Sequence, residues 1–263
     1  MEISFINDEF SNDIDDALNF AKKNHLKYIE LRRINGQELT DFSKEKLFEF
    51  SSKLADNGLL VSAIASDFLN WSLEEKTLNI FGQQADSEAE YFEKLMDIAD
   101  IFGAPNIRIY SYLKDDKLSL EELGKKLDQY SQMALDRGIT LLLENKKECN
   151  IFSVNSMHKL LELYNFSNIY PLLDLGEIVA SGDNYNPQEL QDIINNCLYF
   201  HIKDYDADLK RYVVLGEGHI DYDAIFTDKQ NDKAVIFSLT PQTGYPEDLQ
   251  MSLNMLVSSL DED

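Results

Sequence analysis

The chain has 263 residues, of which 44% are hydrophobic and 11% aromatic, so it can bury a sizeable core and is neither disordered nor fibrous. Its 48 acidic residues outnumber its 24 basic residues, which gives a formal net charge of −24. Because nucleic acids are bound through Lys and Arg, this charge argues against a nucleic-acid partner, and equally against an anionic membrane, although a local basic pocket is compatible with it.

The sequence also predicts a soluble, cytoplasmic protein. Its first residues, 1–4, lack the basic and apolar regions of a signal peptide. No apolar run approaches the roughly 20 residues that a membrane-spanning helix needs. The two cysteines, Cys149 and Cys197, suggest no disulfide framework.

Short apolar runs alternate with amphipathic stretches eight times along the chain. The runs predict strands at residues 3–6, 28–32, 59–65, 107–110, 139–143, 171–175, 198–202 and 234–239. The stretches between them carry apolar residues at helical spacing, as at Ile14, Ala17, Leu18 and Ala21, and a last helix is expected over residues 249–260.

This order predicts the α/β class and a single (β/α)8 barrel over residues 1–263. Runs rich in branched apolar residues and separated by helices indicate a parallel sheet covered on both faces. Eight such units in this length favour closure into a barrel, and no Gly-rich dinucleotide fingerprint follows the first strand. The long connection at residues 66–84 is either a lid or a surface excursion packed on Trp71 and Phe81.

Ionisable residues gather where the predicted strands end, which is where such barrels carry their chemistry. They are Glu30 and Arg32 on the second strand, Glu144 on the fifth, Asp174 on the sixth, and His201, Lys203 and Asp204 on the seventh.

Three of these, Glu144, Asp174 and His201, come from successive strands and predict a divalent-metal site. Each also has an ordinary alternative. Glu144 could pair with Lys146 or Lys203, Asp174 could cap a turn, and His201 could be a satisfied core histidine.

Five stretches carry a resemblance to a known family. They read Ile-Glu-Leu-Arg at 29–32, Leu-Glu-Asn at 143–145, Leu-Asp-Leu-Gly at 173–176, His-Ile-Lys-Asp at 201–204 and Leu-Gly-Glu-Gly-His-Ile-Asp at 215–221. The chain thereby resembles the xylose isomerase-like barrel superfamily, which includes sugar and sugar-phosphate isomerases and epimerases and the endonuclease IV enzymes.

The resemblance implies a metal held by Glu144, Asp174, His201 and a fourth carboxylate from strand eight. This sequence has Thr240 at the fourth position, within Ser-Leu-Thr-Pro-Gln at 238–242. A second departure is Glu177, where many relatives carry His or Asn. We therefore expect Mn²⁺, Mg²⁺ or Zn²⁺ at this site, with binding weakened or lost.

The resemblance further implies a metal-assisted isomerase or epimerase acting on a small sugar, sugar phosphate or inositol derivative, with Glu144 as the general base. Proton transfer on two faces of the substrate would need a replacement for the missing strand-eight glutamate. Glu177 and Glu217 are candidates by residue type, but a solvated loop residue and a turn residue are equally ordinary interpretations.

The other strand-end residues are candidate substrate contacts. Lys203 resembles a residue that relatives place beside substrate oxygens or phosphate, or it forms an ion pair with Asp204 or Glu144. Glu30 and Arg32 contact substrate or form a salt bridge at the barrel mouth.

Two other functions fit the same fold. Thr240, Gln242 and Glu177 are compatible with a barrel that has lost catalysis and binds a sugar-like ligand. An abasic-site endonuclease needs many more His and carboxylate ligands for its metal cluster, and the chain has only four histidines. Its negative net charge also disfavours DNA binding. A homo-oligomer is compatible with the family, although no stretch identifies an interface.

Overall fold

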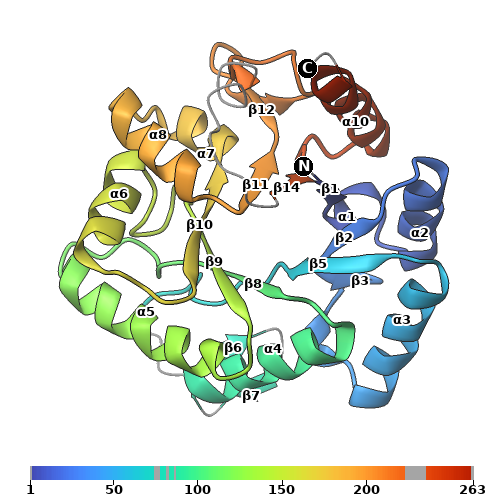
Figure 1. Ribbon diagram of the computed structural model, residues 1–263, viewed down its shortest axis with the longest axis horizontal. Coiled ribbons are helices and arrows are strands. Elements are labelled where there is room, and N and C mark those ends of the chain that lie inside the picture. Colours follow the sequence, from blue (N-terminus) through green and yellow to red (C-terminus); the bar gives the residue numbers. More distant parts are fainter. Residues whose placement is uncertain (1, 74–77, 81–82, 86, 223–234, 262–263) are drawn as a thin grey trace.

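Eight parallel strands form a nearly closed barrel in the computed structural model, which describes residues 2–73, 78–80, 83–85, 87–222 and 235–261 (Figure 1). The strands are β1 (Glu2–Phe5), β2 (Tyr28–Leu31), β5 (Leu60–Ile64), β8 (Asn106–Ile109), β9 (Thr140–Glu144), β10 (Ile169–Asp174), β11 (Tyr199–Ile202) and β14 (Ile236–Leu239). Their order is β1-β14-β11-β10-β9-β8-β5-β2, and a parallel bridge between Ile6 and Glu30 joins the two ends. The predicted (β/α)8 barrel is therefore confirmed.

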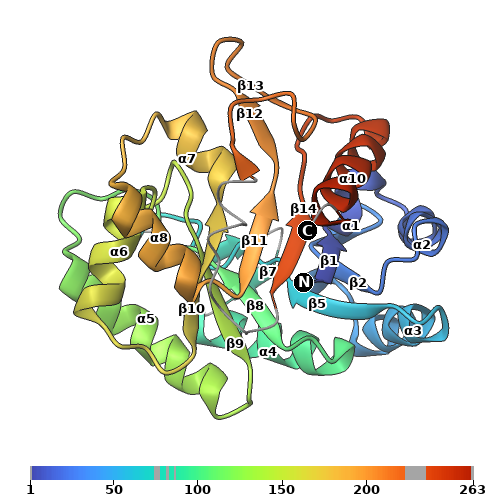
Figure 2. The same cartoon turned by 45° about the horizontal axis from the view of Figure 1, so that its top comes forward.

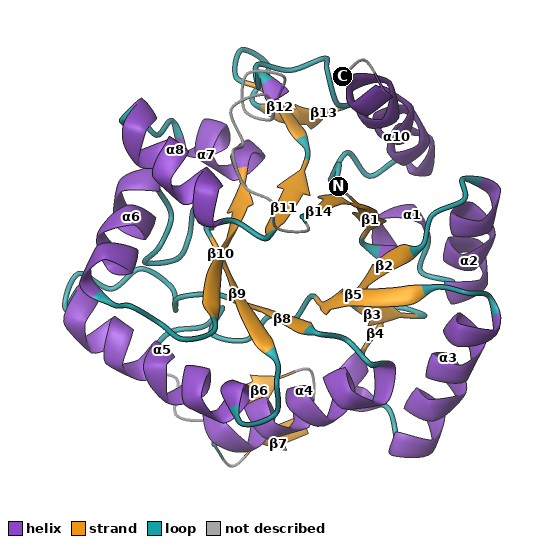
Figure 3. Cartoon of the chain, viewed as in Figure 1, coloured by secondary structure: helices purple, strands orange, loops and turns teal. Residues whose placement is uncertain are grey.

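Helices surround the strands as an outer layer (Figure 3). They are α1 (Asn7–Phe10), α2 (Ile14–Lys23), α3 (Lys44–Asp56), α4 (Glu88–Phe102), α5 (Leu120–Leu135), α6 (Val154–Leu163), α7 (Leu175–Ser181), α8 (Pro187–Asn196) and α10 (Pro246–Asp261). Serine side chains accept a first-turn backbone N–H at four of these helices, because a helix leaves its first amides without partners: Ser43, Ser87, Ser119 and Ser153. None of the described helices is long and apolar enough to cross a membrane.

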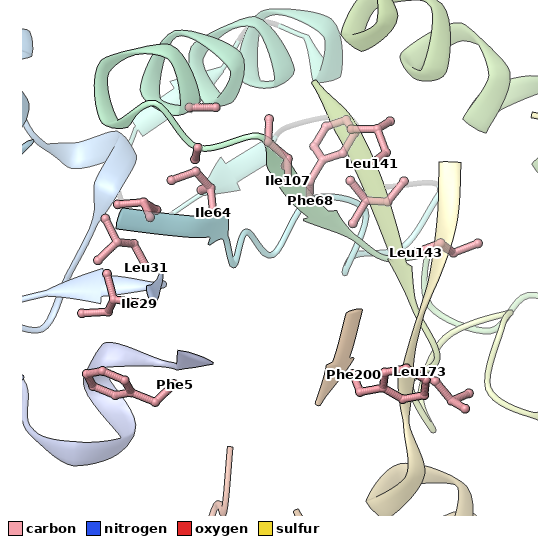
Figure 4. Packing of buried hydrophobic residues seen from close by; sticks show 14 of the residues in the cluster. Phe5, Ile29, Leu31, Ile64, Phe68, Ile107, Leu141, Leu143, Leu173 and Phe200 are labelled. Atoms are coloured by element: carbon pink, nitrogen blue, oxygen red, sulfur yellow. The ribbon is translucent and has the colours of Figure 1, made fainter. Parts of the chain in front are cut away.

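The main hydrophobic core lies between the strands and this helical layer. Alternate residues along the strands, such as Leu141 and Leu143 on β9 and Phe200 on β11, pack into it (Figure 4). The residues between them, Leu142, Leu172 and Tyr199, form a separate small cluster with Ala63. Because strand side chains alternate in direction, this second set fills the barrel interior.

Small antiparallel pairs extend the loops between strands and helices. They are β3 (Arg33–Ile34) with β4 (Gln37–Glu38), β6 (Leu78–Ile80) with β7 (Gln83–Ala85), and β12 (Asp204–Asp206) with β13 (Arg211–Val213). A 3₁₀ turn, η1 (Leu39–Asp41), precedes α3. The β12–β13 hairpin continues beyond the end of β11 at the top of the view in Figure 2.

The first part of the connection after β5 packs against the rest of the protein. Trp71 is buried, and its ring lies edge-on to Phe68 and Tyr91. This supports the interpretation of a packed excursion for residues 66–73. Phe81 and the tip of the predicted lid lie outside the described residues.

Candidate metal and active site

A cavity of about 120 Å³ opens at the carboxyl ends of the strands. Its walls are mostly charged or polar side chains, together with Ile6. They are Arg32, Arg33, Asp67, Arg108, Tyr110, Glu144, Lys146, Glu177, His201, Lys203, Thr240 and Gln242. Since the sequence predicted ionisable residues at these strand ends, the cavity is the candidate active site.

Glu144, Asp174 and His201 converge beside this cavity, and one possible ligand atom from each lies within 4.8 Å of the others. All three side chains are buried. Their convergence follows from register, because Asp174 on β10 pairs with His201 on β11, and Glu144 ends the adjacent strand β9. These residues form a possible metal-binding triad.

His201 is held between two carboxylates. Its Nδ1 lies 2.8 Å from Glu144 Oε1, and its Nε2 lies 3.2 Å from Glu30 Oε1. Glu30 in turn accepts hydrogen bonds from the hydroxyls of Tyr199, at 3.0 Å, and Ser238, at 2.5 Å. The structure therefore places Glu30 behind the imidazole, where it fixes the ring and directs Nδ1 toward Glu144 and Asp174.

These neighbours decide the charge of His201. Burial alone would lower its pKa, but the carboxylates of Glu30 and Glu144 outweigh burial and raise the pKa to about 9. Burial would also raise the pKa of Glu144, yet the charges of His201 and Arg108 lower it well below its usual value. At neutral pH the pair is an imidazolium beside a carboxylate.

Asp174 has a buried ammonium group as its partner. Lys203 Nζ lies 2.7 Å from Asp174 Oδ2 and 3.3 Å from Glu177 Oε1. Burial raises the pKa of Asp174 to about 6 in spite of this cation. Burial alone would lower the pKa of Lys203, but Asp174 and Glu177 raise it, so the ammonium stays charged.

Glu177 joins the cavity wall through several contacts. Besides Lys203, it accepts a short hydrogen bond from the hydroxyl of Tyr212, which lies on β13. The Tyr212 ring also lies 4.8 Å from Lys203 Nζ. Glu177 is therefore part of the site and not a solvated loop residue.

Thr240 stands at the end of β14, in the cavity wall, where the resemblance implies a carboxylate. Its side chain is 1% exposed, and its Oγ1 has no hydrogen-bond partner among the described residues. Gln242, two residues later, donates its backbone N–H to Glu9. The strand-eight position thus offers a neutral oxygen that no protein group uses.

The donor set fits a divalent cation. Glu144 and Asp174 supply carboxylate oxygens, and the unpartnered Thr240 Oγ1 adds a neutral oxygen nearby. His201 supplies Nδ1 once a bound cation has displaced the proton of the metal-free imidazolium. Oxygen and imidazole ligands of this kind suit Mg²⁺, Mn²⁺ and Zn²⁺. Two formal charges from the ligands, instead of three, imply weaker binding than a four-ligand site would give.

Arg32 and the two remaining predicted residues have other partners. Arg32 lines the cavity, but its guanidinium pairs with Asp8 at 2.9 Å and Glu9 at 2.8 Å. Asp204 is buried and accepts backbone N–H groups from Tyr205, Gly216, Gly218 and Ile220. Glu217 is exposed on the loop that follows. Neither Asp204 nor Glu217 lines the cavity.

Sequence reasoning missed Arg108, the third residue of β8. Its Nε lies 3.4 Å from Glu144 Oε2, and its side chain also donates to the carbonyl oxygens of Ala65 and Ser66. Its position between Ile107 and Ile109 could have predicted it as a site residue, because strand side chains alternate in direction and a residue between two core residues faces the barrel interior. Asp67, Tyr110 and Lys146 were missed with it.

Comparison with known proteins agrees with this architecture. A family model described as xylose isomerase-like TIM barrel matches residues 18–246. No curated protein matches the chain.

Solved structures resemble the chain along its whole length. The IolI protein with a bound zinc atom has a TM-score of 0.80 at 19% identity, covering 100% of this chain and 99% of that one. The probable 3-DHS dehydratase AsbF from Bacillus anthracis has a TM-score of 0.77 at 22% identity, covering 98% and 99%. D-allulose 3-epimerase from Methylomonas sp. has a TM-score of 0.74 at 15% identity, covering 98% of each chain. These TM-scores show a common fold. The family match over residues 18–246 shows that the chain belongs to the xylose isomerase-like TIM barrel family.

Proposed function

We propose that this protein is a metal-dependent isomerase or epimerase that acts on a small sugar or sugar phosphate by removing a proton next to a carbonyl. The observation that carries the proposal is the convergence of Glu144, Asp174 and His201 at the polar cavity of the barrel. Two of the similar structures, a zinc-containing IolI protein and a D-allulose 3-epimerase, support it by analogy of fold.

In this proposal Glu144, Asp174 and His201 hold Mn²⁺, Mg²⁺ or Zn²⁺. When bound, the ion acts as a Lewis acid that stabilises negative charge on the substrate oxygens. The low pKa of Glu144 keeps it as a carboxylate at neutral pH. In this proposal Glu144 takes the proton from the hydroxyl-bearing carbon next to the carbonyl and returns it to the former carbonyl carbon, while the hydroxyl proton passes to the former carbonyl oxygen, so that carbonyl and hydroxyl exchange places.

Cationic side chains surround this proton transfer. Arg108 lies next to Glu144, and Lys203 lies between Asp174 and Glu177. Their fixed positive charges favour negative charge that develops on substrate oxygens, because little water screens them in a buried site. We assign Lys203 as the substrate contact among these residues.

The arrangement supports transfer on one face of the substrate. Glu177 is engaged by Lys203 and Tyr212, and Glu217 is exposed outside the cavity. Glu217 therefore lies too far out to act as a second base, and in this proposal Glu177 serves as the partner of Lys203. An aldose–ketose exchange between adjacent carbons needs one base only, and we favour it over a two-face epimerisation.

A second candidate function is binding of a sugar-like ligand without catalysis. Thr240 removes one charged ligand, and protein cations already pair with Asp174 and Glu144. An abasic-site endonuclease is not favoured, because His201 is the only one of the four histidines that lines the cavity.

Metal content and proton exchange test the proposal together. Elemental analysis of the purified protein, incubated with Mn²⁺ or Zn²⁺ and then dialysed, should give one metal per chain. The double variant Glu144→Ala/His201→Ala should lose it, whereas His158→Ala, on the outer helix α6, should retain it. Wild-type protein should then exchange deuterium from solvent into one member of a panel of sugars and sugar phosphates.

Each outcome of this test separates the two candidates. Metal without exchange into any sugar would favour the ligand-binding barrel. Failure to bind metal in excess Mn²⁺ or Zn²⁺ would overturn the metal-dependent mechanism.

A further inference from the structure

The Lys203 ammonium contacts the oxygen of Asp174 that faces the other candidate ligands. Asp174 Oδ1 accepts the backbone N–H of Glu177 at 3.0 Å, so it serves as the helix cap. Asp174 Oδ2 is the oxygen near His201, with 4.0 Å to Nδ1, and Lys203 Nζ lies 2.7 Å from it. The side chains of Lys203 and Asp174 are 2% and 0% exposed, so water screens this pair very little.

A second carboxylate lies within reach of the same ammonium. Glu177 Oε1 is 3.3 Å from Lys203 Nζ, and it accepts a hydrogen bond from the Tyr212 hydroxyl. The Tyr212 ring, 4.8 Å from Nζ, presents its face to the cation. The ammonium therefore lies between two acceptors and can remain paired after a small shift toward Glu177.

The rest of Lys203 is fixed. The Tyr222 hydroxyl accepts its backbone N–H at 3.2 Å and donates to its carbonyl oxygen at 2.7 Å. Its methylene chain lies against Gly176, where an added Cβ would come within 2.6 Å of Lys203 Cγ. The backbone and methylene chain of Lys203 are therefore held in place, and its ammonium lies within 3.3 Å of both Asp174 and Glu177.

We propose that Lys203 is a built-in competitor for the metal site, and that a divalent cation binds by displacing the ammonium from Asp174 to Glu177. The inference rests on the proposed metal site and adds a control on its affinity. A divalent cation and an ammonium repel each other strongly at the separations that one carboxylate oxygen imposes. Metal binding must therefore break the Lys203–Asp174 contact.

The displacement gives Glu177 a function in this chain. Once moved, the ammonium remains buried and needs a carboxylate, because an unpaired buried charge is costly. Glu177, supported by Tyr212, supplies it. The displaced Lys203 also stays in the cavity wall, where it is able to contact a substrate oxygen.

Calorimetric titration of Mn²⁺ at pH 8 tests the competition. Lys203→Met removes the ammonium and keeps a side chain of similar length, so it should bind Mn²⁺ at least tenfold tighter than wild type. Lys146→Met is the matched control, because Lys146 lines the same cavity and its ammonium lies over the Tyr110 ring, with no ion pair to a triad residue. It should change the affinity by less than about threefold, since it removes the same charge at a longer range.

A double-mutant cycle tests the role of Glu177. Glu177→Gln should weaken Mn²⁺ binding about tenfold in wild-type protein, because the displaced ammonium loses its carboxylate. The same change in the Lys203→Met background should have an effect of threefold or less. Equal effects in both backgrounds would show that Glu177 acts only through its own charge and would overturn the displacement.

A crystal structure of the wild type with Mn²⁺ makes the test independent of how the variants fold. The expected result is Mn²⁺ on Asp174 Oδ2 with Lys203 Nζ moved beyond 3.5 Å from that oxygen and paired with Glu177. Mn²⁺ on Asp174 with the original Lys203 contact intact would overturn the inference and leave the proposed function standing. If neither wild type nor Lys203→Met binds Mn²⁺, both the inference and the proposed metal site fail.

Discussion

The ionisable side chains at the bottom of the cavity take their charge states from neighbours that lie far away in the sequence. His201 is raised to a pKa of about 9 by Glu30 and Glu144, which outweigh the effect of its burial. The pKa of Asp174, on the neighbouring strand, is raised to about 6 by the burial of its carboxyl group. The pKa values of both residues are therefore raised, but by different causes: nearby carboxylates for His201 and the lack of water for Asp174.

Substitution of Thr240 should change the metal affinity directly. Thr240→Glu should tighten Mn²⁺ binding roughly tenfold or more, because a third carboxylate adds charge to the ligand set. Thr240→Gln is the matched control, since it has nearly the same size as Glu without the charge, and it should give little gain. Calorimetric titration measures both, and equal affinities for the two variants would mean that residue 240 does not face the ion.

The His201 pKa predicts how stability depends on pH. A group whose folded-state pKa is raised stabilises the protein fully below its unfolded pKa of about 6.5, and the stabilisation is lost as pH rises through 9. With metal removed by a chelator, the free energy of unfolding of the wild type should therefore fall by about 2 kcal/mol more than that of His201→Gln between pH 7 and pH 9.5. Urea unfolding measures this difference, and parallel curves for the two proteins would show that His201 is neutral in the folded state.

The residues of the candidate site were predictable from the sequence only where strand alternation places them. Glu144 and Asp174 end the apolar runs of two strands, and His201 lies one residue before the end of the next strand, so their register alone brings them together. The partners Arg108 and Tyr212 were not predicted. Their positions depend on which strands and hairpins lie side by side, and a single sequence does not contain that pairing.

The β12–β13 hairpin and the loop after it are organised around one buried carboxylate. Asp204 accepts four backbone N–H groups, from Tyr205 next to it and from Gly216, Gly218 and Ile220 beyond the hairpin. Gly218 has to be a glycine here, because a Cβ would lie 2.1 Å from Asp204 Oδ1. Asp204 thereby fixes the segment that brings Tyr212 over Lys203.

Asp204→Ala should destabilise this segment more than any surface change in it. The loss of several charge-assisted hydrogen bonds, with buried amides left unpaired, should cost roughly 2–4 kcal/mol in free energy of unfolding. Hydrogen exchange should accelerate at the amides of residues 205, 216, 218 and 220. Glu217→Ala in the same loop is the control, because Glu217 is exposed and its loss should change stability by less than about 0.5 kcal/mol. Unchanged exchange in Asp204→Ala would mean that neighbouring packing holds the loop.

At the scale of elements, the sequence predicted the eight barrel strands closely, because each is a short run rich in apolar residues with a helix after it. The predicted strand at 139–143 is observed as Thr140–Glu144, one residue later. The small hairpins were not predicted. Strands of two or three residues, such as β12 and β13, are too short to show an alternating pattern and are stabilised by contacts such as those of Asp204.

For the whole molecule, the charge of −24 is distributed so that basic side chains concentrate in the cavity wall. Arg32, Arg33, Arg108, Lys146 and Lys203 all line it, out of 24 basic residues in the chain. Most of these cations are paired with buried or partly buried carboxylates. The excess of negative charge therefore lies elsewhere, and mutual repulsion on the rest of the molecule opposes folding.

Salt should consequently stabilise this protein. Raising NaCl from 10 mM to 500 mM shortens the screening length from about 30 Å to a few Å, which suppresses repulsion between surface carboxylates but leaves buried pairs such as Lys203–Asp174 nearly unaffected. The melting temperature at pH 7.5 should rise by several degrees, measured by calorimetry or circular dichroism. The same salt change at pH 5, nearer the isoelectric point of 4.4, should have a smaller effect because the net charge is lower. A melting temperature that falls with salt at pH 7.5 would show that surface ion pairs outweigh the repulsion.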